Sequence, residues 1–493
     1  MILSVSVLAV MIGVVAGYSP NRLWSTNRYP YNVPYDQSFQ EGYSLLKHTG
    51  SYGPYSNRAS YGIGRDPPAG CAVDQVMMLR RHGERFPQAS AGKAMMDVVQ
   101  QMYKNKTGGG AWTDDLEFLN RWQFFVPEQG YFELESFMGP YAGLLESYRH
   151  GAEYRTRYGH LWDQSPGKRV PIFVADMERV TQTARKFGEG FFAWNYTTSA
   201  AINIISESGK MGANSLTPRC QSNSTGNSVC ANLTNYHPQF DIAAARLNGM
   251  SPGLKLSWID IFALMGKPSY LKMSAFELNV RGYSDWANVF TLDEWVAFGY
   301  QNDLDFYYCN GPGNADNKAV GGVYINATLT LMNQGPEKAG TLFFSFHKSS
   351  HDTNITPVLA ALGIPYVEKD LPTDRIAFPN PYTISDIMPM GGHLTIERLA
   401  CNATAAAPKD TYVRLVLNEA VVPFGACQDG PGYSCSLGNY TRLVQAMLLD
   451  YVSTCNVPAS QPQYLKFFWE YSNSTDWNYQ RGEYIPWQGS SDV

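Results

Sequence analysis

The stretch VDQVMMLRRHGERFP, residues 73–87, joins an apolar run to a loop crowded with positive charge. The first part, Val73 to Leu79, is typical of a β-strand, and Ala91 to Tyr103 then carries apolar residues at helical spacing. A strand, a polar loop and a helix in that order form the basic unit of an α/β fold. The loop RRHGERFP would therefore lie at the carboxyl end of a strand, where such sheets place their ligand sites.

A second unit of this kind begins with the apolar run Val170 to Val174, followed by ADMERVTQTARKFGEGFF. Its apolar side chains recur at helical spacing, so this segment is a predicted amphipathic helix. Asp176 is a candidate cap for that helix. Arg179 then falls in the first helical turn, close to the carboxyl end of the preceding strand.

A third unit begins with Thr341 to Phe346 and continues as HKSSHDTNITPVLAALG. We expect a helix here with Thr353 or Asn354 at its N-cap and Gly363 at its end. His351 and Asp352 lie between this strand and this helix. The fold class is therefore α/β, a sheet flanked by helices, and we expect the three polar loops to converge on one crevice.

Two further strands, His393 to Leu399 and Tyr412 to Leu417, are predicted to form a sheet edge. The stretches between the three units carry helix-like patterns, which indicates a smaller inserted domain. The predicted division is a signal peptide at 1–17, an extended N-terminal arm at 18–70, an α/β catalytic domain at 71–105, 165–194 and 312–493, and an inserted helical domain at 106–164 and 195–311.

Composition excludes several classes of protein. The 493 residues include 38 Lys or Arg against 43 Asp or Glu, and the net charge of −5 argues against a nucleic-acid partner. With 44% hydrophobic and only 16% charged residues, the chain can build a large core. No segment after the leader reaches the roughly 18 apolar residues of a membrane span, so no membrane partner is expected.

Three features predict export. The apolar leader MILSVSVLAVMIGVVAG resembles a secretory signal peptide cleaved near Gly17. The eight cysteines are scattered and even in number, which favours four disulfides: Cys71, Cys220, Cys230, Cys309, Cys401, Cys427, Cys435 and Cys455. Eight sequons are candidates for N-glycosylation: Asn105, Asn195, Asn223, Asn232, Asn326, Asn402, Asn439 and Asn473. A ninth sequon, at Asn354, lies inside the third polar loop and is set aside.

The polar loops carry residues suited to phosphate chemistry. Arg81 and Arg85 flank His82, and guanidinium groups can hold a phosphoryl group by two hydrogen bonds while an imidazole attacks it. A lone histidine after a strand is more often a structural turn residue, but the flanking arginines favour a catalytic role for His82. The alternative interpretation of Arg179 is a solvated charge on the face of its helix. The alternative interpretation of Asp352 is a helix cap.

RHGERFP resembles the R-H-G-x-R-x-P signature of the histidine acid phosphatases, and SHDTNITP resembles that family's second motif. The resemblance extends from about Tyr52 to Gln463 and is closest to the fungal secreted acid phosphatase and phytase branch. It implies that His82 is the nucleophile and Asp352 the proton donor. It also implies that phosphate is bound by Arg81, Arg85, Arg179 and His351, without a metal or cofactor. Relative to the family pattern, a few residues are inserted at HKSSHD, just before the second motif. His347 is therefore a decoy candidate, a histidine that could be mistaken for His351 of the motif.

The resemblance further suggests two disulfides, Cys71 with Cys401 and Cys427 with Cys435. For the remaining cysteines, the same resemblance suggests Cys220 with Cys455 and Cys230 with Cys309. The predicted protein is a secreted acid phosphatase, extracellular or in the cell wall, that hydrolyses phosphate monoesters through a phosphohistidine. The alternatives are a phytase and, in another class, an inactive phosphate-binding cell-wall glycoprotein. A homo-oligomer is left open.

The stretch Ala111 to Arg149 is acidic and could lie near the substrate entrance. It has two basic residues, Arg121 and Arg149. Its seven acidic residues are Asp114, Asp115, Glu117, Glu128, Glu133, Glu135 and Glu146. Such a rim would repel a polyanion, so we expect a general phosphatase that accepts phytate mainly at low pH. The competing interpretation is an outward-facing helix surface with no bearing on substrates.

Overall fold

Strand β1 (Cys71–Arg81) is the predicted first strand and lies inside a ten-stranded mixed sheet. The computed structural model describes residues 44–220, 228–234, 237–265, 273–347, 355–403 and 409–485. β1 pairs in parallel with β4 (Leu342–His347) and antiparallel with β5 (His393–Cys401). From Gln75 onward every residue of β1 is buried. Burial on both faces explains why Val76 to Leu79, in the middle of the strand, form an apolar run without alternation.

The order of the strands is β10-β9-β3-β2-β4-β1-β5-β6-β7, with β8 paired to β6. β2 (Val170–Ala175) pairs in parallel with β3 (Ala200–Ile205) and with β4. The predicted pair β5 and β6 (Asp410–Leu417) is antiparallel but does not form the edge, because β7 continues the sheet. The short strands are β7 (Ala420–Val422), β8 (Cys435–Ser436), β9 (Trp477–Asn478) and β10 (Glu483–Tyr484).

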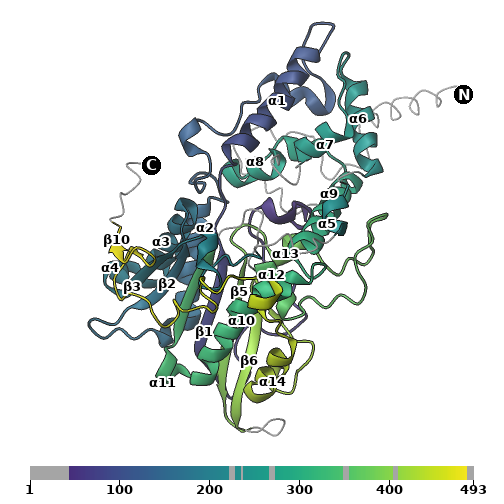
Figure 1. Ribbon diagram of the computed structural model, residues 1–493. Coiled ribbons are helices and arrows are strands. Elements are labelled where there is room, and N and C mark those ends of the chain that lie inside the picture. The colour runs from purple at the N-terminus through teal and green to yellow at the C-terminus, as the bar shows by residue number, and fades with distance from the viewer. Residues whose placement is uncertain are drawn as a thin grey trace, which may run out of the picture.

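Helices cover both faces of the sheet. Successive side chains of a strand point to opposite faces, and in β4 the ring of Phe344 contacts Phe187 whereas Phe343 contacts Phe468. The first face carries α2 (Gly143–Tyr158) and α3 (Glu178–Phe192), which pack side by side (Figure 1). Phe468 also contacts Tyr324 of α10 (Asp316–Gln334), which places that helix on the opposite face.

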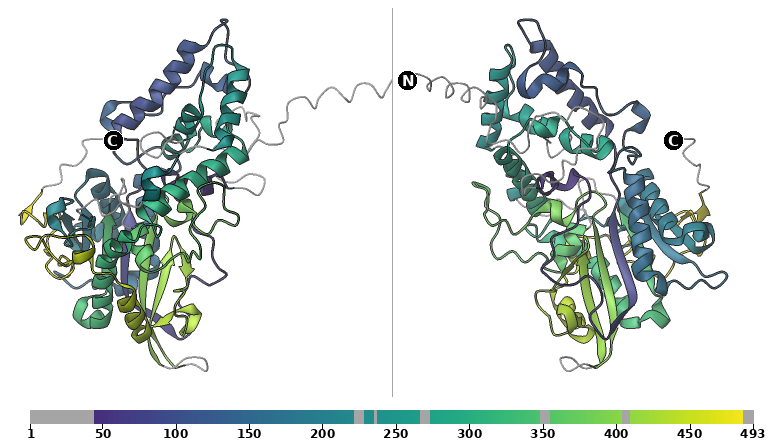
Figure 2. Two further views of the ribbon diagram at one scale, coloured as in Figure 1. Left: turned by 45° about the vertical axis from the view of Figure 1, so that its right-hand side comes forward. Right: turned by 180° about the vertical axis from the view of Figure 1, so that it is seen from behind.

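A second core is built by five helices and the loops between them. They are α1 (Ala89–Asn105), α6 (Pro238–Met250), α7 (Trp258–Met265), α8 (Met273–Arg281) and α9 (Leu292–Asp305). Both views of Figure 2 show this helical part at the end of the molecule opposite to the strands β5 and β6. The packing joins α1 to the helical core and α2 to the sheet, whereas the predicted ranges place them the other way round. The exact division into domains stays a prediction.

The other α-helices of the described chain are α4 (Tyr196–Ser199), α5 (Ser228–Asn232), α11 (Pro336–Ala339), α12 (Ile355–Ala361), α13 (Ile384–Ile387), α14 (Leu437–Met447) and α15 (Tyr451–Thr454). The predicted cap Asp176 is wrong, because Met177 holds the N-cap position of α3 and no side chain caps that helix. Gly363, with φ of +65°, follows the end of α12 as predicted. Thr353 and Asn354 lie outside the described residues.

The four predicted disulfides are confirmed: Cys71–Cys401, Cys220–Cys455, Cys230–Cys309 and Cys427–Cys435. Cys71 and Cys401 face each other in the β1–β5 register, so this bond closes the ends of two paired strands. In the described part of the chain no helix is long and apolar enough to cross a membrane. The predicted leader, 1–17, lies outside the described residues.

The described part of the predicted arm, from residue 44 to 70, lies against the body of the protein. Leu45 and Leu46 are buried, and the ring of Tyr52 contacts Phe276 of α8. Further along, Arg65 forms an ion pair with Glu397 of β5. The arm therefore joins the helical part to the sheet and passes close to the end of β1.

Candidate active site

The sheet brings two of the three predicted polar loops together. Arg81 is the last residue of β1 and stands opposite His347, the last residue of β4, in the parallel register. β2 lies on the other side of β4 and leads into α3, whose first turn carries Arg179. The carboxyl ends of these parallel strands meet at one edge, where open α/β sheets bind their ligands.

The double arginine of the motif is divided between the two faces of β1. Arg80 donates from Nη2 to Glu146 of α2 over 2.7 Å, and Glu146 also contacts His150 Nδ1 at 2.5 Å. Burial alone would raise the pKa of Glu146, but the charges of Arg80 and His150 lower it to about 2. Arg80 therefore belongs to a buried ion pair beneath the motif, and alternation along the strand leaves Arg81 to the site.

Arg81, His82, Arg85 and Arg179 form a buried cluster in which each residue is at most 3% exposed. Among the described residues, several of their nitrogens have no hydrogen-bond partner. These atoms are Nε and Nη2 of Arg81, Nε2 of His82, Nε of Arg85, and Nε and Nη2 of Arg179. Buried polar groups are normally satisfied. A set of unpaired guanidinium donors around one imidazole fits a bound anion with several oxygens, such as a phosphoryl group.

The tautomer of His82 follows from its one hydrogen bond. Its Nδ1 lies 2.7 Å from the carbonyl oxygen of Gly83, which can only accept, so Nδ1 carries the proton. Nε2 then holds the lone pair of a neutral imidazole. Burial, followed by the charges of Arg179, Arg81 and Arg85, lowers the pKa of His82 well below its usual value. The imidazole of His82 therefore remains neutral, with a lone pair on Nε2, in mildly acidic solution.

The arginines are held by the backbone and by aromatic rings. Arg81 donates from Nη1 to the carbonyl oxygen of Met388 over 2.9 Å and also to that of Ser51, and its guanidinium lies 5.7 Å from the centre of the Tyr52 ring. Arg85 donates to the Phe86 carbonyl over 2.8 Å and lies over the Phe276 ring. Neutral partners fix these side chains without neutralising their charge.

The positive charges of the cluster repel one another. Burial lowers the pKa of Arg81 to about 10, and the neighbouring charge of Arg179 contributes. Burial and the charge of Arg179 also lower the pKa of Arg85 well below its usual value. The pKa of Arg179 is lowered chiefly by burial. A bound anion would reduce the repulsion between these positive charges, as expected of a site suited to phosphate.

Glu135 holds the loop RHGERFP in place, a role that the sequence did not suggest. Its Oε1 accepts from the Gly83 backbone N–H over 2.7 Å and from the hydroxyl of Thr183, which lies one turn beyond Arg179 on α3. Burial raises the pKa of Glu135 to about 8, so its carboxyl group is neutral at acid pH. A Cβ on Gly83 would come within 2.7 Å of Glu135 Oε1 and 2.9 Å of the Gly143 carbonyl, so this position requires glycine.

The acidic stretch Ala111 to Arg149 contains both buried and exposed carboxyl groups. Three of its seven carboxyl groups are buried: Asp115 pairs with Arg246, Glu135 binds Gly83, and Glu146 pairs with Arg80. Glu133 is the member that reaches the cluster, with Oε2 3.4 Å from Nη1 of Arg179 and 46% of its side chain exposed. The rim predicted from seven carboxylates is therefore corrected to a local contact at Glu133.

The predicted residues His351 and Asp352 lie outside the described residues. The segment that carries them starts after His347 and ends before Ile355, the first residue of α12. His347, named above as a decoy, is fully buried at the end of β4 beside Arg81. Their assignment to the site remains a prediction from the SHDTNITP motif.

An α/β sheet with a neutral histidine set among buried arginines at its carboxyl edge is suited to binding phosphate around an imidazole. Residues 72–418 match the family model of the histidine phosphatase superfamily, branch 2. The match covers more than half of the chain, and the chain belongs to this family.

Relatives with known names span nearly the whole chain. A phytase of Candida albicans is 36% identical over 452 residues, covering 90% of this chain and 93% of the relative. An acid phosphatase of Komagataella pastoris is 35% identical over 445 residues, covering 89% and 92%. The crystal structure of the phytase from D. castellii superimposes with a TM-score of 0.80 at 32% identity, covering 92% of this chain and 97% of that one. The predicted family and fold class are thus confirmed.

Proposed function

We propose that this protein is a secreted acid phosphatase that hydrolyses phosphate monoesters through a phosphohistidine on His82. The observation that carries the proposal is the buried cluster of unpaired guanidinium nitrogens around a neutral imidazole. Family membership supports the reaction class, because the relatives include acid phosphatases at 31–35% identity. All motif residues are present, which argues against an inactive phosphate-binding glycoprotein.

In the first step, the lone pair on His82 Nε2 attacks phosphorus as the bond from phosphorus to the ester oxygen breaks. Asp352 gives its proton to the departing oxygen, which leaves as an alcohol. Arg81, Arg85, Arg179 and His351 donate hydrogen bonds to the other phosphoryl oxygens, whose negative charge they stabilise in the transition state. The nitrogen–phosphorus bond now holds the phosphoryl group on the enzyme.

In the second step, the Asp352 carboxylate accepts a proton from a water molecule whose oxygen attacks phosphorus. The nitrogen–phosphorus bond breaks, inorganic phosphate leaves, and His82 returns to its neutral tautomer with the proton on Nδ1. The Gly83 carbonyl holds that tautomer through both steps. Glu135 fixes Gly83 and thereby the direction of the imidazole.

Export and glycosylation belong to the same proposal. Four disulfides favour an oxidising compartment, since such bonds are rare in reducing ones. The leader sequence and the sequons agree with a secreted glycoprotein. The partners are small phosphate monoesters.

The pH profile tests the proposed function. With p-nitrophenyl phosphate, kcat/KM should not fall as the pH is lowered from about 6.5 to about 4.5, because the depressed pKa of His82 keeps its imidazole neutral in that range. EDTA should leave the rate unchanged, because the guanidinium groups supply the positive charge at the phosphate. A loss of activity toward acid with a midpoint near 6.5, dependence on a metal, or no phosphate release would contradict the proposal.

A phytase is the second candidate function, favoured by the named relatives from Candida albicans and D. castellii. Glu133 beside Arg179 disfavours a polyanion while its carboxyl group is charged. We expect kcat/KM for phytate to be lower than for a simple monoester at about pH 5.5 and to gain on it as exposed carboxyl groups protonate near about pH 4. Glu133→Gln should raise the phytate value selectively at the higher pH. A phytate preference in the wild type at about pH 5.5 would identify a phytase instead.

A further inference from the structure

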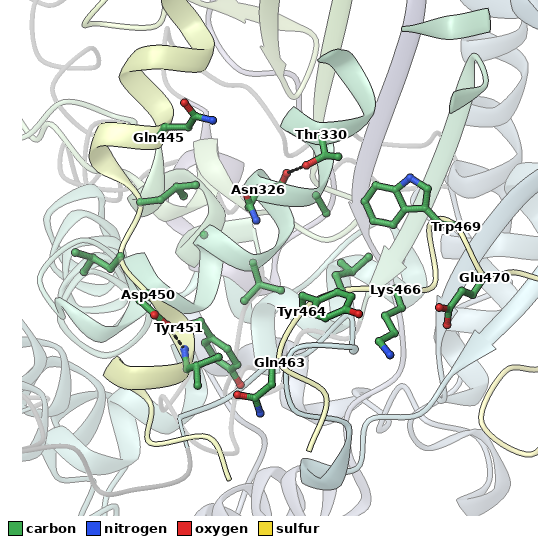
Figure 3. Close-up of a pocket in the computed structure, with 17 residues that line it drawn as sticks. Asn326, Thr330, Gln445, Asp450, Tyr451, Gln463, Tyr464, Lys466, Trp469 and Glu470 are labelled. Carbon is green, nitrogen blue, oxygen red and sulfur yellow. Dashed lines mark hydrogen bonds between the residues drawn. The ribbon is translucent and has the colours of Figure 1, made fainter. Parts of the chain in front are cut away.

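A groove of about 780 Å³ lies outside the candidate active site and shares no residue with it. One wall is helix α10, another is the end of α14 with the link to α15, and the third is the C-terminal segment from Gln463 to Glu470 (Figure 3). Its volume falls within the range of about 300 to 1,000 Å³ that is typical of small-molecule sites. The groove therefore has room for a ligand the size of one or a few sugars.

A glycosylation sequon opens into this groove. Asn326, Ala327 and Thr328 form it on α10, and the side chain of Asn326 is exposed. Figure 3 places Asn326 between Gln445 on one wall and Trp469 on the other. Asn326 also lines an adjoining hollow of about 600 Å³, so a group attached to its amide would have space on both sides. Among the described residues, that side-chain amide has no hydrogen-bond partner.

Two aromatic rings stand exposed in the groove amid polar side chains. Trp469 is 41% and Tyr464 is 62% exposed. The indole of Trp469 is fixed by a 3.2 Å hydrogen bond from Nε1 to Gln334 Oε1, and Lys466 lies 5.1 Å from the centre of the Tyr464 ring. A pyranose has an apolar C–H face and a rim of hydroxyl groups, so it suits aromatic faces bordered by amides and charges. Gln445 and Gln463 supply such amides.

We propose that this groove holds the first N-acetylglucosamine units of a glycan attached to Asn326, packed against Trp469 and Tyr464. A lipid diphosphate-linked oligosaccharide is the sugar donor. Asn326 Nδ2 forms a bond to C1 of the first sugar and loses one proton, while the bond from C1 to the diphosphate oxygen breaks. Nδ2 keeps one N–H. The proposal rests on the secretion included in the proposed function, and it adds that the protein binds its own glycan.

Protection of the glycan from enzymatic release tests the proposal. The full chain is secreted from a eukaryotic host with oligomannose glycans, treated with endoglycosidase H under native conditions, and followed by glycopeptide mass spectrometry. We expect the Asn326 glycan to be released at least about tenfold more slowly than glycans at the exposed sites Asn105 and Asn402, since release requires the sugars to leave the groove. Trp469→Ala with Tyr464→Ala should abolish this difference.

Trp469→Phe keeps an aromatic face and should retain most of the protection, which separates sugar packing from general damage to the fold. An unmodified Asn326, or equal release at all three sites in the wild type, would overturn the proposal. A change of the wild-type monomer–dimer balance in Trp469→Ala would also overturn it, because the groove would then bind a second copy of the chain. Phosphatase activity should be the same in all of these variants. Absence of the protection in a wild-type protein that is active rejects this proposal alone, and absence of activity in the wild type rejects the proposed function.

Discussion

His82→Ala should lower kcat by at least about 10⁴-fold, the scale seen when a covalent nucleophile is removed. The variant lacks the nitrogen that attacks phosphorus, and among the described residues no other side chain in the cluster offers a neutral nucleophile. Binding of inorganic phosphate should persist, because Arg81, Arg85 and Arg179 keep their places. Steady-state assays give the first quantity, and isothermal titration calorimetry with inorganic phosphate gives the second.

The matched control is His237→Ala. His237 is also a buried histidine with a depressed pKa, but it bonds Gln301 in the helical part and touches none of the cluster. Its removal should cost stability and leave kcat within about twofold of the wild type. If His82→Ala turned over substrate at a rate near that of the control, another residue would have to be the nucleophile.

Arg179→Ala and Arg185→Ala should have opposite effects, although both arginines are buried on α3. Arg179 has two unpaired nitrogens in the buried cluster, so its loss should lower kcat/KM by about 10²- to 10³-fold. The melting temperature should stay unchanged or rise, because the substitution removes repulsion with Arg81 and Arg85. Thermal unfolding and steady-state kinetics on each variant supply the two readouts.

Arg185 instead lies in the middle of the helix and pairs with Asp476 over 2.8 Å. Its removal leaves a buried carboxylate without this partner and should destabilise the protein by about 3 to 5 kcal/mol. The kcat of the folded fraction should remain near that of the wild type. A large loss of stability in Arg179→Ala with unchanged kcat/KM would make Arg179 a structural residue.

Much of the fold could be predicted, because strands that are buried on both faces are recognised in the sequence by their runs of apolar residues. The strands β1, β2 and β4 each contain a largely apolar run followed by a polar loop, so their positions followed from pattern alone. The disulfide pairs came from the family resemblance, since spacing cannot select among eight cysteines. The cap of α3 was predicted wrongly, because Asp176 has cap chemistry but the helix starts two residues later.

Site residues could be predicted where a local sequence motif identifies them. They could not be predicted where only tertiary contacts determine which residues reach the site. RHGERFP singled out His82 and its arginines, but it could not show that Arg80 turns away to Glu146. Glu135 lies 52 residues after Gly83 in sequence, in a segment without a signature, and only the fold brings the two together. Its acidic neighbours suggested a charged rim because burial and pairing are not visible in composition.

Trapping of the phosphoenzyme tests the central claim most directly. Wild-type protein is mixed with radiolabelled substrate, stopped within milliseconds in alkaline denaturant, and digested for mass spectrometry. We expect phosphate bound to one histidine, on the peptide that carries His82, stable in alkali and lost in acid, and absent from His82→Ala. A phosphoryl group on another residue, or none in a protein that turns over substrate, would contradict the phosphohistidine mechanism.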